Sequence, residues 1–301
     1  MNLEKNWGVK GSSELFRRAR YRVSSSPLRV PILWLRHRGM RESDVFLGSY
    51  PRSGSTWLRF TLFELLSGQP ATFESVNQFM RGPGTHNLGL AALPNAGRFL
   101  STHEAYRSEY HRGVYLVRDV RDVVTSEFWY EKERGFGCHD FGDYLHKMLT
   151  GQKKYGSWQN HASSWLDSET ARSGNLKVIR YEDMRRDPEP VLTDLLQFLG
   201  RPTEPSVIRR AVENNALESM RAKEDALHKK PQQVRFPEKP AAPANEDGRF
   251  VRQGLVGGWR RKLPLHAVQL IDQYAGDTLA RLGYAVESSV VEDCATQLSM
   301  S

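Results

Sequence analysis

The chain has 301 residues, a formal net charge of +8 and only two cysteines. Its composition is ordinary for a globular protein, which excludes disordered and disulfide-rich classes, and no apolar run approaches the roughly 18 residues of a transmembrane helix. Cys138 and Cys294 are far apart without metal-ligand spacing, and the first residues lack a signal-peptide pattern, so we expect free thiols and a cytoplasmic location.

The positive charge is concentrated near the N-terminus. Residues 1–43 contain ten basic and three acidic side chains, which account for seven of the eight net charges. One interpretation is a solvated basic extension that packs partly on the core. The other is an arm that contacts an anionic membrane surface or an acidic substrate. No nucleic-acid partner is expected, and the rest of the chain is nearly neutral.

Residues 44–66, DVFLGSYPRSGSTWLRFTLFELL, predict a strand, a turn and a helix. The apolar run 44–50 is typical of a buried strand, and leucines recur at helical spacing in 57–66. Residues 51–56 are therefore a strand-to-helix turn, where unsatisfied N–H groups and the helix dipole favour an anion. The GxxxxGK[ST] pattern is absent, so this is not a Walker A loop.

The remaining elements follow in chain order. Residues 68–96 and 229–248 are rich in Gly, Asn or Pro and predict an irregular segment and a loop. Further strands are expected at 98–102, at 113–117 and ending at 180, and helices at 120–131, 141–149, 158–171, 188–199 and 265–282. This alternation predicts one α/β domain with a central, mostly parallel sheet flanked by helices, and a site at the carboxyl ends of the strands.

Four motifs resemble those of a known family. YPRSGSTW (50–57) is similar to YPKSGTTW of the cytosolic-type sulfotransferases, which use 3′-phosphoadenosine-5′-phosphosulfate (PAPS). VRDVRDVVTS (117–126), IRYEDM (179–184) and FVRQGLVGGW (250–259) resemble three further signatures in the same order. The resemblance implies a sulfotransferase domain over 44–283 with a P-loop-like phosphosulfate-binding turn, a basic extension 1–43 and a tail 284–301.

The resemblance also implies the donor-binding residues. The turn would bind the 5′-phosphosulfate, with Trp57 stacked on adenine, and a second set would bind the 3′-phosphate. The implied residues are Arg52, Ser53, Gly54, Ser55, Thr56, Trp57, Arg118, Ser126, Tyr181, Phe250, Arg252, Gln253 and Gly254. Near the adenine, Asn215, Ala216 and Leu217 depart from the family pattern, so contacts there are expected to differ.

The implied catalytic residues are His103 and Arg52. STHEAY (101–106) resembles the family's KTHLP, which makes His103 the general base. Arg52 replaces the family lysine that stabilises the departing phosphate, so its contribution is electrostatic. Ser101 replaces a second family lysine, so one charge is expected to be missing and the demand on Arg52 to grow. No metal is implied, and adenosine 3′,5′-bisphosphate (PAP) is the product.

Alternative functions and the acceptor stay open. The alternatives are a Mg²⁺-dependent nucleotide kinase or ATPase, a non-catalytic nucleotide-binding protein with a basic arm, and a dehydration through a sulfated intermediate. The acceptor is expected to be a small molecule with a hydroxyl or amine, and polar residues 85–87 favour a glycosylated or phenolic metabolite. His161 is interpreted equally as core or as pocket lining. The family dimer motif is mostly absent, which leaves the oligomeric state open.

Overall fold

The computed structural model describes residues 29–133, 140–229, 249, 251 and 254–286. Most of the basic extension, the proline-rich segment and most of the C-terminal tail lie outside these residues. No helix in the described part combines the length and apolar character needed to cross a bilayer.

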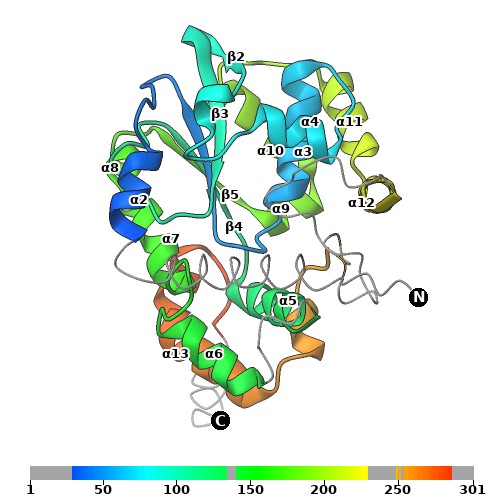
Figure 1. Ribbon diagram of the computed structural model, residues 1–301. Coiled ribbons are helices and arrows are strands. Elements are labelled where there is room, and N and C mark those ends of the chain that lie inside the picture. Colours follow the sequence, from blue (N-terminus) through cyan, green and yellow to red (C-terminus); the bar gives the residue numbers. More distant parts are fainter. Residues whose placement is uncertain (1–28, 134–139, 230–248, 250, 252–253, 287–301) are drawn as a thin grey trace, which may run out of the picture.

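The described chain alternates strands with helices, as predicted (Figure 1). The strands are β1 Val45–Ser49, β2 Ala91–Leu93, β3 Gly97–Thr102, β4 Gly113–Val117 and β5 Leu176–Arg180. The α-helices are α2 Arg29–Arg36, α3 Ser55–Ser67, α4 Phe73–Phe79, α5 Val120–Glu133, α6 Phe141–Leu149, α7 Trp158–Leu166, α8 Glu169–Arg172, α9 Tyr181–Arg186, α10 Pro188–Phe198, α11 Pro205–Asn214, α12 Leu217–Lys229 and α13 Leu265–Arg281. Short 3₁₀ turns are η1 His86–Leu88, η2 Pro94–Ala96 and η4 Gly258–Arg261.

The five strands form one mostly parallel sheet in the order β2-β3-β1-β4-β5. β1 is parallel to β3 and to β4, β4 is parallel to β5, and β2 adds an antiparallel edge. Gly48 of β1 pairs with Thr102 of β3, so the turn after β1 and the residues after β3 leave the sheet at the same edge. The predicted fold class is confirmed, and the carboxyl ends of β1, β3 and β4 lie together.

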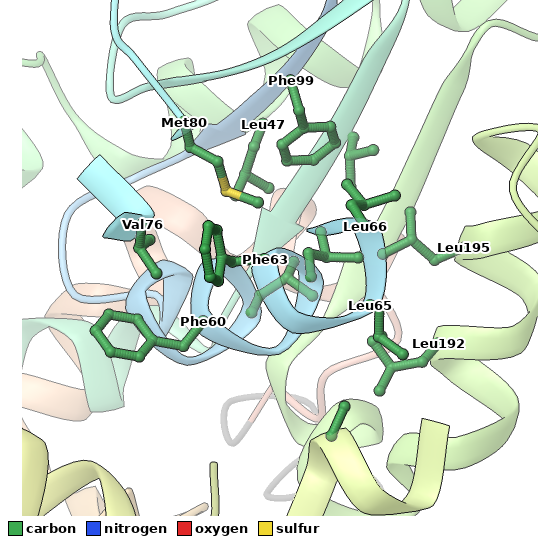
Figure 2. Packing of buried hydrophobic residues seen from close by; sticks show 14 of the residues in the cluster. Leu47, Phe60, Phe63, Leu65, Leu66, Val76, Met80, Phe99, Leu192 and Leu195 are labelled. Carbon is green, nitrogen blue, oxygen red and sulfur yellow. The ribbon is translucent and has the colours of Figure 1, made fainter. Parts of the chain in front are cut away.

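Helices cover both faces of the sheet (Figure 1). Side chains alternate along β1: Val45 and Leu47 face a cluster with α3, α4, α10 and α11, while Phe46 faces a second cluster with α5, α6, α7 and α13. Figure 2 shows the first cluster, in which α3 residues such as Phe63 and Leu66 pack towards Leu47 and the sheet. The predicted leucine stripe of α3 is thus confirmed as core, and it fixes the helix that follows the turn.

Two sequence predictions of local structure are wrong. The helix expected at 158–171 breaks into α7 and α8, because the side chain of Ser168 accepts a hydrogen bond from the N–H of Ala171 and starts a new helix. Residues 68–96 are more regular than expected, since Thr72 and Ser75 form a capping box that begins α4.

A buried ion pair closes the amino end of the sheet. Arg98 at the start of β3 donates from Nε to Asp44 Oδ1 at 2.8 Å and from Nη2 to Oδ2 at 2.5 Å. Its other N–H groups donate to the carbonyl oxygens of His86 and Gly39. The side chains of Arg98 and Asp44 are 1% and 0% exposed, and Asp44 also accepts the backbone N–H of Arg41 at 2.9 Å. Both charges are therefore neutralised and hydrogen-bonded within the protein.

Candidate active site

The turn between β1 and α3 has the backbone geometry of an anion-binding loop. Arg52 has φ +66° and Gly54, the N-cap of α3, has φ +91°, so the chain enters the left-handed region twice within three residues. Gly54 supplies no capping side chain to the first N–H groups of α3, at Ser55 and Thr56. The hydroxyl of Ser53, a residue with no exposed surface, has no hydrogen-bond partner in the described part of the chain. These donors suit an anion.

Tyr181, the first residue of α9, lies directly against this turn. A Cβ atom at Gly54 would lie 2.4 Å from Cδ2 of the Tyr181 ring, so the ring and the positive φ both require glycine at this position. The Tyr181 hydroxyl donates to the carbonyl oxygen of Gly254 at 3.0 Å. Three predicted site residues from three separate motifs are therefore in contact.

Arg118, at the end of β4, connects the same segments. It donates from Nη1 to the carbonyl oxygen of Arg52 at 3.2 Å and from Nη2 to that of Leu255 at 2.8 Å. Its guanidinium carbon lies 4.5 Å from the ring centroid of Tyr181. Nη2 also lies 3.7 Å from a carboxylate oxygen of Asp122, while Nε is buried without a hydrogen-bond partner among the described residues.

Arg52 links the turn to the second predicted phosphate-binding set. Its Nε donates to the hydroxyl of Ser126, on α5, at 3.1 Å, and its guanidinium carbon lies 4.5 Å from the ring centroid of Tyr130. Because Arg118 binds the carbonyl of the same Arg52, the two predicted phosphate-binding sets adjoin each other.

Asp122 is an organising residue that the sequence analysis missed. Its carboxylate accepts the N–H groups of Gly257 at 2.8 Å and Trp259 at 3.0 Å, which holds the last motif over α5. Burial raises the pKa of Asp122, although Arg118 and the two N–H groups oppose this shift. Its position four residues after Arg118 on a predicted helix was an available signal.

The other predicted residues of the last motif, at 250–259, lie outside the described residues: Phe250, Arg252 and Gln253.

The predicted adenine corner contains Trp57 and a lysine that the sequence analysis did not single out. Trp57 is half-buried, and the guanidinium carbon of Arg185 lies 5.4 Å from its ring centroid. Asn215 is fully buried and accepts a hydrogen bond from Lys223 Nζ at 2.7 Å, and Lys223 also lies 3.4 Å from a carboxylate oxygen of Glu64. Asn215 is therefore held within the protein by this lysine.

His103 follows β3 and lies beside the end of β1. Its Nδ1–H donates to the carbonyl oxygen of Ser49 at 2.8 Å; because a carbonyl only accepts, Nε2 is left with the lone pair. Burial lowers the pKa of His103, and the charges of Arg59, Lys154 and Arg52 lower it further, against the opposing Ser49 hydrogen bond. The ring is half-buried, and it is neutral at physiological pH with Nε2 ready to accept a proton.

His161 is a core residue that supports the segment carrying His103. It is 1% exposed, donates from Nε2 to the carbonyl oxygen of His103 at 3.2 Å, and accepts the Tyr115 hydroxyl at Nδ1 at 3.0 Å. Burial lowers the pKa of His161 to about 3. Trp158 and Trp165 are also fully buried, as the helical spacing predicted. The structure therefore settles the open interpretation of His161 in favour of the core.

A second titratable group near the turn was also missed. Glu127, next to Ser126 on α5, accepts the hydroxyl of Tyr144 at 3.2 Å. Burial and the neighbouring Glu131 raise the pKa of Glu127 to about 7. Glu131 itself pairs with Lys153 at 2.5 Å.

In the described part of the chain no group of three or more His, Cys, Asp or Glu residues is placed to hold a metal ion, and a metal-free site stays a prediction.

Comparisons with known proteins agree with the motifs. The sequence matches the family described as Sulfotransferase domain over residues 42–283. Human Sulfotransferase 2B1 is 27% identical over 249 residues, which cover 78% of this chain and 65% of the human protein, just under two thirds of its length. The guinea pig 3-beta-hydroxysteroid sulfotransferase is 24% identical over 268 residues, covering 85% of this chain and 89% of that protein.

The fold is also similar to that of solved structures. Mouse sulfotransferase SULT7A1, crystallised in a complex with PAP, has a TM-score of 0.60 and 22% sequence identity, covering 85% of this chain and 90% of the mouse chain. This likeness confirms the α/β architecture.

Proposed function

Since this chain belongs to the sulfotransferase domain family, we propose that it transfers the sulfuryl group of PAPS to a hydroxyl or amine of a small-molecule acceptor. One observation carries the proposal: residues of four separated motifs meet at the carboxyl ends of β1, β3 and β4. A base lies there together with several polar donors that have no acceptor among the described residues. A Mg²⁺-dependent kinase is not favoured, because the Walker A lysine is absent.

The residues present fit a donor with two anionic ends. The buried Ser53 hydroxyl and Arg118 Nε have no hydrogen-bond partner within the described ranges, and phosphate oxygens are acceptors that suit such donors. The turn Arg52–Trp57 would hold the 5′ end, and Arg118 with Ser126 the 3′-phosphate, under the segment that begins at Gly254. The roles of Phe250, Arg252 and Gln253 remain predictions from the motif.

The chemistry follows from the protonation state of His103. PAPS, when bound, supplies a sulfuryl group on a phosphate leaving group. His103 Nε2 takes the proton of the acceptor hydroxyl as the oxygen–sulfur bond forms. Arg52 keeps a fixed positive charge beside the turn, which stabilises the phosphate oxygen from which sulfur departs. Because the pKa of His103 is lowered, the imidazole stays neutral to a lower pH than an ordinary histidine does.

The position of residues 85–87 does not support the acceptor class expected from the sequence. His86 packs at the amino end of the sheet, where its Nε2 donates to the carbonyl oxygen of Arg38 and its carbonyl oxygen accepts a hydrogen bond from Arg98, while Thr85 and Asn87 beside it are exposed. They therefore say nothing about the acceptor. Residues 80–82 lie beside Ser101 at the carboxyl end and are better candidates for its pocket. A sterol therefore joins the glycosylated or phenolic metabolites expected from the sequence, since the guinea pig relative is named for a 3-beta-hydroxysteroid.

Two further properties are proposed from the sequence. The widely separated cysteines support a cytoplasmic location, and the charge of residues 1–43 supports weak contact with an anionic surface.

The test is transfer of label from PAPS. The protein is incubated with sulfur-labelled PAPS and a panel of phenols, sterols, sugars and glycopeptides, and products are followed by mass spectrometry. The proposal expects at least one acceptor to gain a sulfuryl group without added Mg²⁺. An acceptor that loses water in a PAPS-dependent step indicates elimination after transfer. Phosphoryl transfer from ATP in place of sulfuryl transfer contradicts the proposal.

A further inference from the structure

Arg59, on the second turn of α3, is a largely buried cation that has no anionic partner among the residues that the structure describes. Its Nη2 donates to Asn77 Oδ1 at 2.6 Å and to the carbonyl oxygen of Met80 at 3.4 Å, and both acceptors are neutral. Nε is buried and has no hydrogen-bond partner among the described residues. Within that part of the chain, no carboxylate lies within ion-pair distance of Arg59.

Burying the charge of Arg59 costs free energy unless an anion binds to the guanidinium. A buried charge normally requires a paired and hydrogen-bonded counter-charge, as Arg98 has in Asp44. Burial alone lowers the pKa of Arg59 to about 10, and no carboxylate opposes that shift. Even so, the side chain stays protonated near neutral pH. Its Nε is therefore a buried donor whose acceptor the described residues do not supply, and an anion suits it.

The position of Arg59 identifies where that anion would lie. The carbonyl oxygen of Met80 accepts both Arg59 Nη2 and the hydroxyl of Ser101, so the guanidinium and Ser101 are neighbours. Met80 is buried in the cluster of Figure 2, which holds this carbonyl in place. Ser101 precedes His103 by two residues, and Arg59 is the cation whose charge acts most strongly on His103. Arg59 thus lies near His103, the proposed base, on the side of residues 80–82.

We propose that Arg59 binds oxygens of the sulfuryl group of the donor beside His103, and so provides the positive charge that Ser101 does not. The inference rests on the proposed function. Sulfuryl oxygens are negatively charged before and during transfer, and a preorganised cation in a buried site stabilises such charge strongly. On this proposal the electrostatic demand that was expected to grow on Arg52 is shared between Arg52 in the turn and Arg59 on α3.

The test compares PAPS with PAP, because PAP has the same phosphates and lacks the sulfuryl group. Affinities for both are measured by calorimetry without acceptor for the wild type and for Arg59→Met. We expect the affinity for PAPS to fall about 10-fold relative to PAP and kcat to fall about 10- to 100-fold, as for loss of one charge-assisted hydrogen-bond donor. Arg59→Lys, which keeps the charge, should recover part of both.

A second variant separates charge from packing. Asn77→Asp places a carboxylate on Nη2 and neutralises Arg59 without removing it, so it should lower the PAPS-to-PAP ratio in the same direction. Arg209→Met, which removes an exposed arginine of α11 paired with Glu189 of α10, is the matched control and should change neither the ratio nor kcat.

Two results overturn the assignment. Equal weakening of PAPS and PAP by Arg59→Met means that Arg59 only supports the fold of the site. Unchanged donor affinity with a higher KM for acid-bearing acceptors alone means that the anion belongs to the acceptor. Failure of the proposed function looks different, because the wild type itself would then neither bind PAP nor transfer label.

Discussion

The two ends of the central sheet differ in whether their buried polar groups have hydrogen-bond partners. At the amino end, the side chains of Arg98 and Asp44 bind one another and four backbone carbonyl or N–H groups. At the carboxyl end, Ser53 Oγ, Arg59 Nε and Arg118 Nε are buried without protein partners in the described part of the chain. The first arrangement stabilises the fold by itself. The second leaves donors without acceptors among the described residues, which on the proposed function an anionic ligand would supply.

This contrast predicts that substitutions at the two ends separate stability from function. Changes at the amino end should lower the free energy of unfolding and leave the kinetics of the folded protein intact. Changes at the carboxyl end should alter binding or turnover with little loss of stability, because strained or unsatisfied sites are maintained for function.

The largest effect on function is expected from His103→Ala. Loss of a general base typically costs a factor of about 10² to 10⁴ in kcat. The affinity for PAP should be unchanged, since the ring contacts Ser49 and not the predicted phosphate-binding residues. Steady-state kinetics and PAP calorimetry on the same preparation check both halves. Retention of full activity would remove His103 from the mechanism.

The largest effect on stability is expected from Asp44→Asn. It leaves the fully buried guanidinium of Arg98 without its counter-charge, which costs about 3–5 kcal/mol in comparable pairs. Urea unfolding measures the loss, and kcat per folded molecule should stay at the wild-type value. A cost similar to that of an exposed pair, such as Arg209 with Glu189, would show that the pair does not stabilise this end of the sheet.

Arg118→Met is expected to weaken PAP binding by roughly 10- to 100-fold, as for loss of a donor to a charged group. Arg118→Lys is the conservative control and should recover part of the affinity, because it keeps the charge but loses the fork. Equal PAP affinity in all three proteins would place the 3′-phosphate elsewhere.

A smaller, pH-dependent effect is expected from His161. Its pKa of about 3 in the folded protein lies below the ordinary value of 6.5, so the unfolded chain binds the proton first as pH falls. The contribution of His161 to stability is therefore complete above about pH 6.5 and is lost progressively towards pH 3, by roughly 1.4 kcal/mol per pH unit. In His161→Gln, the unfolding free energy should change less between pH 7 and pH 5.5. Identical slopes would show that His161 is not buried neutral.

The sequence predicted the parts of the molecule that local pattern determines. Strands β1, β3 and β4, the leucine stripe of α3 and the residues at the strand ends follow from apolar periodicity and turn chemistry. It did not predict Arg59, because an arginine between helical leucines reads as a solvated side chain until tertiary packing by α4 buries it. The role of residues 85–87 was misinterpreted for the same reason, since only the fold brings the carbonyl oxygen of His86 to the guanidinium of Arg98.

The central claim is that the carboxyl end of the sheet is built for an adenosine carrier with two phosphates. The most direct test is the melting temperature of the full chain with PAP and with ATP at equal concentrations and without Mg²⁺. PAP should raise the melting temperature by mass action, and ATP should raise it far less. An equal or greater shift with ATP, or none with PAP, would contradict the account.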